Sequence, residues 1–193
     1  YETRDKFAVA SGEAVMNLIE KNIRPRDIVT RKSLENAAVI VAASGGSTNA
    51  ALHLPAIANE AGIKFTLEDV TNISKKTPYI ADLKPGGKYV AKDLYEIGGV
   101  PILIKALLDG GFLHEDCLTV SGKTIAENHK DVVFPPNQKI IYKTSKPLSS
   151  SGGFVGLKGN LAPDGAIVKV AGMKRRKFKG KAKCFDGEPS ALN

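Results

Sequence analysis

The spacing of apolar residues over roughly the first two thirds of the chain predicts a series of helices. The first spans residues 2–21, where Phe7, Val15, Leu18 and Ile19 form an apolar stripe. The same period recurs in further segments between glycines, prolines and capping residues. These predicted helices cover residues 34–43, a segment from the turn at 45–46 to Gly62, residues 67–75, 90–97 and 101–108, and a last one ending near residue 130.

Residues with special backbone preferences set the ends of these helices. Pro25 ends the first one, because a proline pushes the residue before it out of helical space. Ser33 is placed to cap the second helix, and Thr66 to cap the helix over 67–75. Pro101 begins a helix in its first turn, where its missing N–H costs little.

The pattern changes near Pro135, after which the helical period disappears. Short apolar segments at 140–142, 155–157 and 166–171 predict strands, as does an earlier one at 117–120. Strands separated at short intervals by glycine and proline are typical of a barrel or a sandwich. We therefore predict an α/β fold with a mostly helical first part, residues 1–140, and the start of a β-barrel-like domain, residues 141–193. The connector is the segment SKPLSSSGG, residues 145–153.

The amino-acid composition indicates the broad class of protein to which the chain belongs. Of the 193 residues, 42% are hydrophobic and 25% are charged, which is ordinary for a globular chain. No apolar run approaches the ~20 residues that span a bilayer. The beginning, YETRDKFAVAS, lacks the apolar stretch of a secretory signal, so we expect a cytoplasmic protein. Cys117 and Cys184 form no CxxC pair, and we expect two reduced thiols rather than a disulfide framework or a complete metal site.

The formal net charge of +8 is concentrated in one segment. Residues 174–183, KRRKFKGKAK, hold seven lysines or arginines, and the rest of the chain carries only +1. In this segment Lys177, Lys179, Lys181 and Lys183 alternate with smaller or apolar residues, which predicts a half-buried strand with a charged outer face. A nucleic-acid-binding protein usually has a basic face that is spread more widely. We therefore expect no nucleic-acid partner, although binding through this run stays an alternative.

The strongest local candidate for binding is a turn before an apolar helix, Gly45-Gly46-Ser47-Thr48-Asn49. Unpaired N–H groups and a partial positive charge at a helix N-terminus attract a phosphate or carboxylate, and glycines let it approach the backbone. The alternative is that Ser47 or Thr48 only caps the helix. His53 on the same helix has no evident partner, which is more typical of a packed or solvated residue than of a catalyst.

Lys123 is a second candidate. It lies in Ser121-Gly122-Lys123-Thr124, which is similar to the end of a phosphate-binding loop, but Cys117 stands where that motif needs its first glycine. Lys123 either neutralises an anion at a helix start or is an ordinary surface lysine. The chain has no nucleophile elbow, no paired-carboxylate signature and no metal-ligand spacing, so its residues alone disclose no reaction.

Five segments, in order, resemble the dihydroxy-acid dehydratase family, which also includes sugar-acid dehydratases such as the phosphogluconate enzyme. They are RPRDIVTRKSLENA (24–37), GGSTNAALHLPAIANEAG (45–62), PYIADLKPGGKYVAKDLYEIGGVP (78–101), DCLTVSGKTIAEN (116–128) and GLKGNLAPDGAIVKVAG (156–172). Residues 82–85 and 156–172 look closer to the branched-chain amino-acid enzyme than to the sugar-acid enzymes.

The resemblance implies a homodimeric lyase that removes water from 2,3-dihydroxy-3-methyl acids to give 2-keto acids in valine and isoleucine synthesis. It also implies an iron–sulfur cluster and Mg²⁺ in the full-length enzyme. Because such a substrate carries a carboxylate, Ser47, Thr48, Asn49 and Lys123 become substrate-binding candidates. The alternatives are a sugar-acid dehydratase of the same family and, in another class, a standalone anion- or nucleic-acid-binding module.

The chain also departs from the pattern of this family. The family's cluster cysteines, magnesium carboxylates and modified lysine precede the region matched by Tyr1, and a further magnesium glutamate and the catalytic serine follow the region that ends here. Neither Cys117 nor Cys184 falls in a ligand motif, and Pro189 interrupts the paired acids that the family shows near Glu188. We expect a central fragment of the enzyme, with no catalytic residue and no metal ligand in this chain, inactive by itself.

Overall fold

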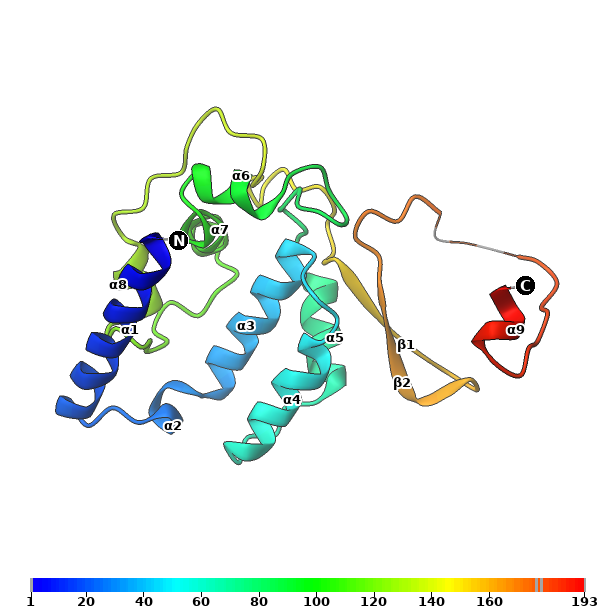
Figure 1. The fold of residues 1–193 in the computed structure, drawn as a ribbon, viewed down its shortest axis with the longest axis horizontal. Helices are drawn as coiled ribbons and strands as arrows, with labels where there is room; N and C mark the ends of the chain where they lie inside the picture. The colour runs from blue at the N-terminus through cyan, green and yellow to red at the C-terminus, as the bar shows by residue number, and fades with distance from the viewer. Residues whose placement is uncertain (1, 176, 178, 193) are drawn as a thin grey trace.

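The computed structural model describes residues 2–175, 177 and 179–192, and most of these residues with regular structure are helical (Figure 1). The long helices are α1 (Glu2–Glu20), α3 (Arg31–Ser44), α4 (Ala50–Glu60), α5 (Leu67–Lys76) and α7 (Val100–Asp109). Shorter helices are α2 (Pro25–Ile28), α6 (Ala91–Glu96), α8 (Ile125–His129) and α9 (Glu188–Leu192). Two strands complete the regular elements, β1 (Phe154–Gly159) and β2 (Ala162–Lys169).

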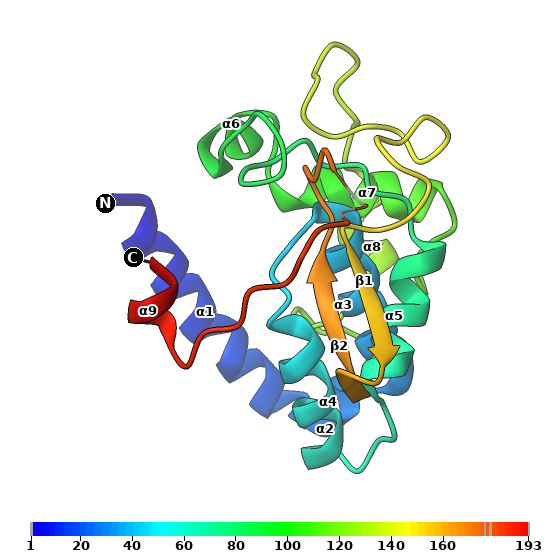
Figure 2. The same cartoon turned by 90° about the vertical axis from the view of Figure 1, so that its right-hand side faces the viewer.

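Helix α3 lies at the centre of the helical body, beside α4 and α5 (Figures 1 and 2). Three of its four alanines, Ala38, Ala42 and Ala43, are completely buried, and small side chains let neighbouring segments pack closely. On one side Val39 and Ala43 join a core with Leu107 and Ile141. On the other side α3 shares a second core with α4, α5 and the beginning of β1; its buried residues are Leu34, Ala38, Ala42, Ala51, Ala58, Phe65, Val70 and Phe154.

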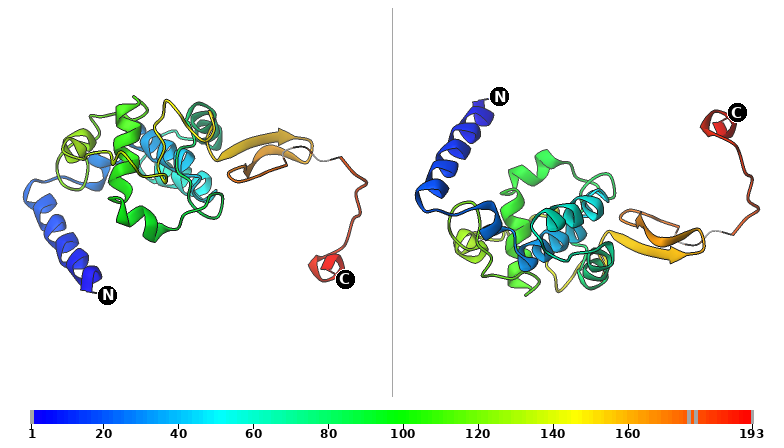
Figure 3. Two further views of the ribbon diagram at one scale, coloured as in Figure 1. Left: turned by 90° about the horizontal axis from the view of Figure 1, so that it is seen from above. Right: turned by 90° about the horizontal axis from the view of Figure 1, so that it is seen from below.

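The predicted first helix is confirmed as α1, but its apolar stripe is not buried against the described chain. Phe7, Val15 and Ile19 are 64%, 54% and 65% exposed. Figure 3 shows α1 extending away from the helical body. Leu18, the fourth residue of the stripe, is half-buried, so only a small part of the stripe is covered within the described residues.

The helix ends follow capping chemistry, with one correction. The N-cap of α3 is Thr30, not Ser33, which occupies the third helical position. Thr30 Oγ1 accepts the Ser33 N–H at 3.2 Å, and Ser33 Oγ accepts the Thr30 N–H at 2.9 Å, which makes a reciprocal capping box. Thr66 caps α5 as predicted, and Pro101 lies in the first turn of α7.

The predicted strands at 155–157 and 166–171 form one antiparallel hairpin that extends from the helical body (Figures 1 and 3). Phe154 pairs with Lys169 and Leu157 with Ala166, and the register shifts between Leu157 and Gly159. Residues 140–142 and 117–120 contribute only isolated bridges, at Ile141 and Leu118. The fold is therefore mostly helical with a small two-stranded sheet among the described residues, and the β-barrel-like domain stays a prediction.

The strand predicted in the basic run is wrong for the residues that are described. Lys174, Arg175, Lys177 and residues 179–183 are exposed and adopt no regular structure, while Arg176 and Phe178 lie outside the described residues. An alternating pattern needs a neighbouring strand to pair with. Within the described chain, β1 pairs only with β2, and neither strand pairs with this run.

Candidate functional site

The glycine turn predicted as an anion site follows directly from the end of α3. Gly45 is the C-cap of α3 with a φ of 61°, a left-handed conformation that favours glycine. Space also requires glycine there, because a β-carbon at Gly45 would lie 2.8 Å from Tyr79 Cε2. The Gly46 N–H donates to the Val41 carbonyl at 3.0 Å and closes the helix end. The chain then reverses toward α4.

Ser47, Thr48 and Asn49 form the approach to α4, and their side chains make no capping bond to the helix. Asn49 is the N-cap but its side chain makes no capping hydrogen bond, and Ser47 Oγ accepts the Asn49 N–H at 3.2 Å. The Ser47 and Thr48 carbonyls accept the first two helical N–H groups. Among the described residues, nothing accepts a hydrogen bond from the N–H groups of Ser47 and Thr48. The turn therefore offers two free donors and exposed side chains at Ser47 and Asn49.

Lys123 lies at the opposite end of α3 from this turn. Its neighbour Gly122 packs near Lys21, and the adjoining segment is tied to the start of α3 by an ion pair of 2.6 Å between Asp116 and Lys32. With 14 residues, α3 is about 21 Å long. The structure therefore does not bring Lys123 together with Ser47, Thr48 and Asn49.

The segment around Lys123 forms a helix cap rather than a phosphate-binding loop. Thr124 Oγ1 accepts the Glu127 N–H at 3.1 Å, and a Glu127 carboxylate oxygen accepts the Thr124 N–H at 2.7 Å. The Lys123 carbonyl accepts from both the backbone N–H and the hydroxyl of Thr119. Its side chain is exposed, as is that of His53 on α4.

Beside the glycine turn lies a small cavity of about 200 Å³. Tyr79 and Asp82 line it, and both are 7% exposed. The Tyr79 hydroxyl is buried and has no hydrogen-bond partner within the described residues. Burial raises the pKa of Tyr79, and the negative charge of Asp82 raises it further. The remaining wall is mostly backbone or small side chains: Gly86, Leu148, Gly152, Gly153, Val170, Ala171, Gly172 and Met173.

Sequence reasoning missed this cavity. Its walls come from three segments, around residues 79–86, 148–153 and 170–173, which are far apart in the sequence. Tyr79 and Asp82 fall between the helices predicted over residues 67–75 and 90–97, where no periodic pattern indicates burial. The available signal was the density of glycine in all three segments, which permits close backbone contact.

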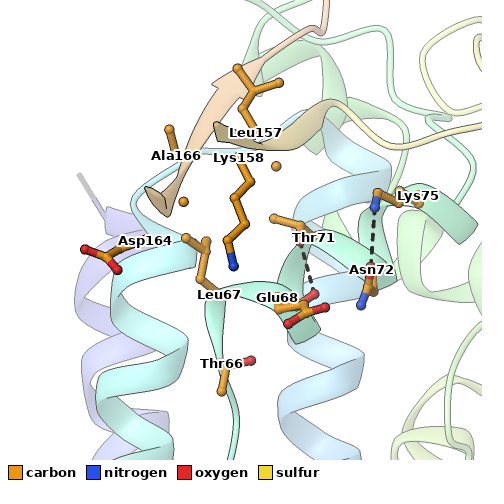
Figure 4. Close-up of a pocket in the computed structure, with 12 residues that line it drawn as sticks. Thr66, Leu67, Glu68, Thr71, Asn72, Lys75, Leu157, Lys158, Asp164 and Ala166 are labelled. Atoms are coloured by element: carbon orange, nitrogen blue, oxygen red, sulfur yellow. Dashed lines mark hydrogen bonds between the residues drawn. The ribbon is translucent and has the colours of Figure 1, made fainter. Parts of the chain in front are cut away.

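A larger hollow of about 440 Å³ lies between α5 and the hairpin (Figure 4). Figure 4 shows the Lys158 side chain extending from β1 toward α5. The opposite wall carries Glu68, Asn72 and Lys75, and Lys75 Nζ donates to Asn72 Oδ1 at 3.5 Å. Side chains of both charges line the hollow and none of the charged ones is buried. It is a groove where the hairpin meets the helix, and it contains no convergent set of donors or acceptors.

A charged network ties α3 to its neighbours away from both hollows. Arg31 contacts Glu35 and Asp69, each at 2.8 Å, and its guanidinium lies 4.7 Å from the centre of the Phe65 ring. The hydrogen bond from Arg31 lowers the pKa of Asp69 to about 2. For Glu35, burial is outweighed by hydrogen bonds from Arg31 and His114, so its pKa lies below its ordinary value. Arg31 also donates to the Lys64 carbonyl at 2.7 Å, so each of its three guanidinium nitrogens donates a hydrogen bond within the described chain.

The residues of the described chain do not provide a metal centre. Across residues 2–175, 177 and 179–192, no three His, Cys, Asp or Glu side chains come together as ligands. Cys117 is buried, which raises the pKa of its thiol, and Cys184 is exposed. The iron–sulfur cluster and Mg²⁺ implied by the resemblance find no ligand set among these residues, so no step of a reaction is assigned to them here. No described helix is both long enough and apolar enough to cross a membrane.

Comparison with known proteins identifies relatives of the whole chain. The N-terminal model of the dihydroxy-acid/6-phosphogluconate dehydratases matches residues 1–128, and the C-terminal model matches residues 139–193. Dihydroxy-acid dehydratase 2 of Bradyrhizobium diazoefficiens is 67% identical over 192 residues, which cover 100% of this chain and 33% of the relative. The dihydroxy-acid dehydratase of Pelagibacter ubique is 68% identical over 192 residues, covering 100% of this chain and 34% of the relative. The corresponding enzyme of Parvibaculum lavamentivorans is 68% identical over 190 residues, covering 97% of this chain and 33% of the relative. The chain therefore spans about a third of the length of these relatives.

Proposed function

This chain belongs to the dihydroxy-acid/6-phosphogluconate dehydratase family, and from that premise we propose that the protein containing it is a dihydroxy-acid dehydratase. The enzyme would remove water from a 2,3-dihydroxy-3-methyl acid and form a 2-keto acid. The observation that carries the proposal is identity of 67–68% along the whole chain to proteins named dihydroxy-acid dehydratase. The sugar-acid alternative rests only on the joint name of the family model.

The chemistry defines what a binding site has to provide. Hydroxide is a poor leaving group, the proton at C2 needs a base, and the substrate carboxylate needs a counter-charge or donors. Within this chain, the turn at Ser47, Thr48 and Asn49 suits the last task. The free N–H groups of Ser47 and Thr48 and the exposed side chains of Ser47 and Asn49 support that assignment.

Lys123 is the weaker part of the substrate-binding proposal. It lies at the far end of α3 from the turn, so one small acid cannot reach both within this chain. We retain Lys123 as a candidate for a separate anionic contact. The proposal for the carboxylate rests on the turn alone.

The finer features implied by the family resemblance remain part of the proposal. They are an iron–sulfur cluster and Mg²⁺, a homodimer, a cytoplasmic location and a role in valine and isoleucine synthesis. We propose that the cofactor ligands lie in the two thirds of the relatives' length that this chain does not span. A division into residues 1–140 and 141–193 is supported by two family models that separate between residues 128 and 139.

Turnover by the full-length protein tests the proposed function. Purified protein is incubated with 2,3-dihydroxy-3-methylbutanoate, and formation of the 2-keto acid is followed by its hydrazone absorbance. We expect stoichiometric keto-acid formation, and no product from 6-phosphogluconate under the same conditions. Turnover of 6-phosphogluconate alone would favour the sugar-acid alternative.

Two variants test the turn. Ser47→Ala removes a side chain but keeps the backbone donors, whereas Ser47→Pro removes one backbone N–H. We expect the proline variant to raise KM for the acid more than the alanine variant. Equal KM values in the wild-type protein and both variants would refute carboxylate binding at this turn.

Steeply salt-dependent binding of DNA or RNA through residues 174–183, with no turnover of either acid, would support the binding-module alternative.

A further inference from the structure

Charged side chains of alternating sign form a row from α5 through α3 to the segment of residues 112–117, which lies between α7 and α8. Asp69 on α5 pairs with Arg31 on α3 at 2.8 Å, and Arg31 pairs with Glu35 one turn further along α3 at 2.8 Å. The second carboxylate oxygen of Glu35 lies 2.7 Å from Nε2 of His114. Two carboxylates face one guanidinium in this row, so a proton on the His114 ring balances its charges.

The backbone of His114 is held in place independently of its ring. The His114 N–H donates to Oδ1 of Asn36 at 2.8 Å, and Nδ2 of Asn36 donates to the His114 carbonyl at 2.9 Å. Asn36 lies on α3 and is buried. Because an amide side chain does not titrate, these two bonds keep His114 beside Glu35 whether or not its ring is charged. A change of pH therefore alters the charge of the ring at a fixed position.

The contact between His114 and Glu35 has a defined donor. Burial opposes the ionisation of Glu35, but hydrogen bonds from Arg31 and His114 lower its pKa, so the carboxylate is charged near neutral pH. An ionised carboxylate only accepts hydrogen bonds, and Nε2 of His114 therefore carries the hydrogen. A further proton binds at Nδ1 and converts a hydrogen bond from a neutral ring into an ion pair. Hydrogen bonds in which donor and acceptor are both charged are the stronger kind.

The other charged groups around the His114 ring keep their charge over the neutral pH range. Arg31 opposes a second positive charge nearby, but two carboxylates already share its guanidinium. Glu115 and Asp116 follow His114 in the same segment, and Asp116 pairs with Lys32 on α3 at 2.6 Å. That hydrogen bond is the main cause of the lowered pKa of Asp116, and a charge on His114 lowers it further. Carboxylates, guanidinium and ammonium groups do not ordinarily titrate between pH 6 and 9, whereas imidazole does.

We propose that His114 and Glu35 form a pH-sensitive clamp, which holds residues 112–117 on α3 more tightly when the His114 ring is protonated. The clamp tightens as the pH falls from 9 to 6 and loosens as the pH rises. Its acid limit is set by Glu35, because the ion pair is lost again where this carboxylate takes up a proton. The element that opens is the segment itself, which leads from α7 through the buried Cys117 to Lys123. The clamp is independent of the proposed dehydratase activity.

Hydrogen exchange of the full-length protein, followed by mass spectrometry, measures the opening of this segment. The exchange rate divided by the intrinsic rate at the same pH gives a local opening constant. We expect the opening constant of residues 112–117 to rise about threefold from pH 6 to pH 9. The factor is modest because the side chains of His114 and Glu35 are 41% and 28% exposed. Residues 102–107 of α7 are the internal reference and should show no such rise.

Three variants assign the effect to the two residues. His114→Gln keeps a neutral donor, and Glu35→Gln removes the charge of the acceptor, so each should abolish the rise between pH 6 and pH 9. Lys32→Met is the matched control, because it breaks an ion pair between the same helix and the same segment whose charges are constant over this range. It should raise the opening constant at both pH values and keep the dependence on pH.

Each other outcome counts against the clamp. An equal opening constant at pH 6 and pH 9 in the wild-type protein would overturn it without any variant. An equal rise in residues 102–107 would show a change of the whole protein rather than of this segment. A rise that persists in His114→Gln would assign the titration to another group. A rise that His114→Gln abolishes and Glu35→Gln keeps would make Asp116 the partner of the ring and overturn the pairing with Glu35.

Discussion

Arg31 and Asp69 join α3 to α5 through a charged hydrogen bond of 2.8 Å between the Arg31 guanidinium and a carboxylate oxygen of Asp69. The other oxygen of Asp69 accepts from the N–H and the hydroxyl of Thr66, at 2.7 and 2.9 Å. One carboxylate therefore holds two helices together and caps one of them. Glu35 extends the network from Arg31 to His114.

This relationship predicts a stability that depends on pH. The pKa of Asp69 falls from 3.8 in the unfolded chain to about 2, so the carboxylate stabilises the fold fully above about pH 5. The contribution is lost as the pH falls through about 2. Asp69→Asn should lower the free energy of unfolding by about 1–2 kcal/mol at pH 7, allowing for screening at the half-exposed Arg31.

Urea denaturation at pH 7 and pH 2 measures this difference. The difference in the free energy of unfolding between the wild-type protein and Asp69→Asn should nearly vanish at the lower pH. Asp131→Asn, an exposed aspartate without an ion pair in the described chain, is the control and should match the wild-type protein at both values. A gap that persists at pH 2 would show that the carboxylate charge is not its cause.

The contact between Gly153 and Gly45 predicts a different sensitivity. A side chain at Gly153 would meet the Gly45 α-carbon at 2.6 Å, whereas a β-carbon at Gly159 in the same hairpin would have nothing within 4 Å. Gly153→Ala should therefore lower the free energy of unfolding by about 1–3 kcal/mol, the usual cost of overpacking. Gly159→Ala should change it by less than about 0.5 kcal/mol.

Thermal or urea denaturation of the two glycine variants provides the comparison. Equal stability of both would mean that the hairpin does not dock on the end of α3 as described. A loss confined to Gly159→Ala would contradict the packing completely.

The apolar stripe of α1 leads to a third prediction. Phe7 is 64% exposed, so Phe7→Ser should change the free energy of unfolding of the 193-residue chain by less than about 0.5 kcal/mol. Leu107 is completely buried, and Leu107→Ala should cost about 2–5 kcal/mol. Denaturation curves of both variants measure these changes in the free energy of unfolding. A large loss in Phe7→Ser would indicate that α1 packs against another surface in solution.

Features that depend on neighbours in sequence could be predicted from the sequence. Thr66 caps α5, Pro101 lies in the first turn of α7 and Gly62 follows α4, because capping and backbone preferences act within a few residues. The incorrect prediction that Ser33 is the N-cap of α3 has the same local origin. Thr30 and Ser33 bond reciprocally in one capping box, and the choice between them depends on where the first helical turn begins.

Features that depend on distant segments could not be predicted. The alternation around Lys177 is compatible with a strand, but a strand forms only where another strand pairs with it. The cavity of Tyr79 and Asp82 needs contacts from residues 148–153 and 170–173, which local patterns do not indicate. The separation of Lys123 from Ser47 follows from the length and direction of α3, which brings them to opposite ends. The enzyme family, in contrast, was apparent from five ordered segments.

A competition assay measures whether the full-length protein is a dihydroxy-acid dehydratase or a sugar-acid dehydratase. The full-length protein receives 2,3-dihydroxy-3-methylbutanoate and 6-phosphogluconate together at equal concentration, and both 2-keto acids are followed by NMR. We expect the branched dihydroxy acid to be consumed at least a hundredfold faster, a difference in transition-state binding of about 2.7 kcal/mol. Preferential consumption of 6-phosphogluconate, or consumption of neither acid, would contradict it.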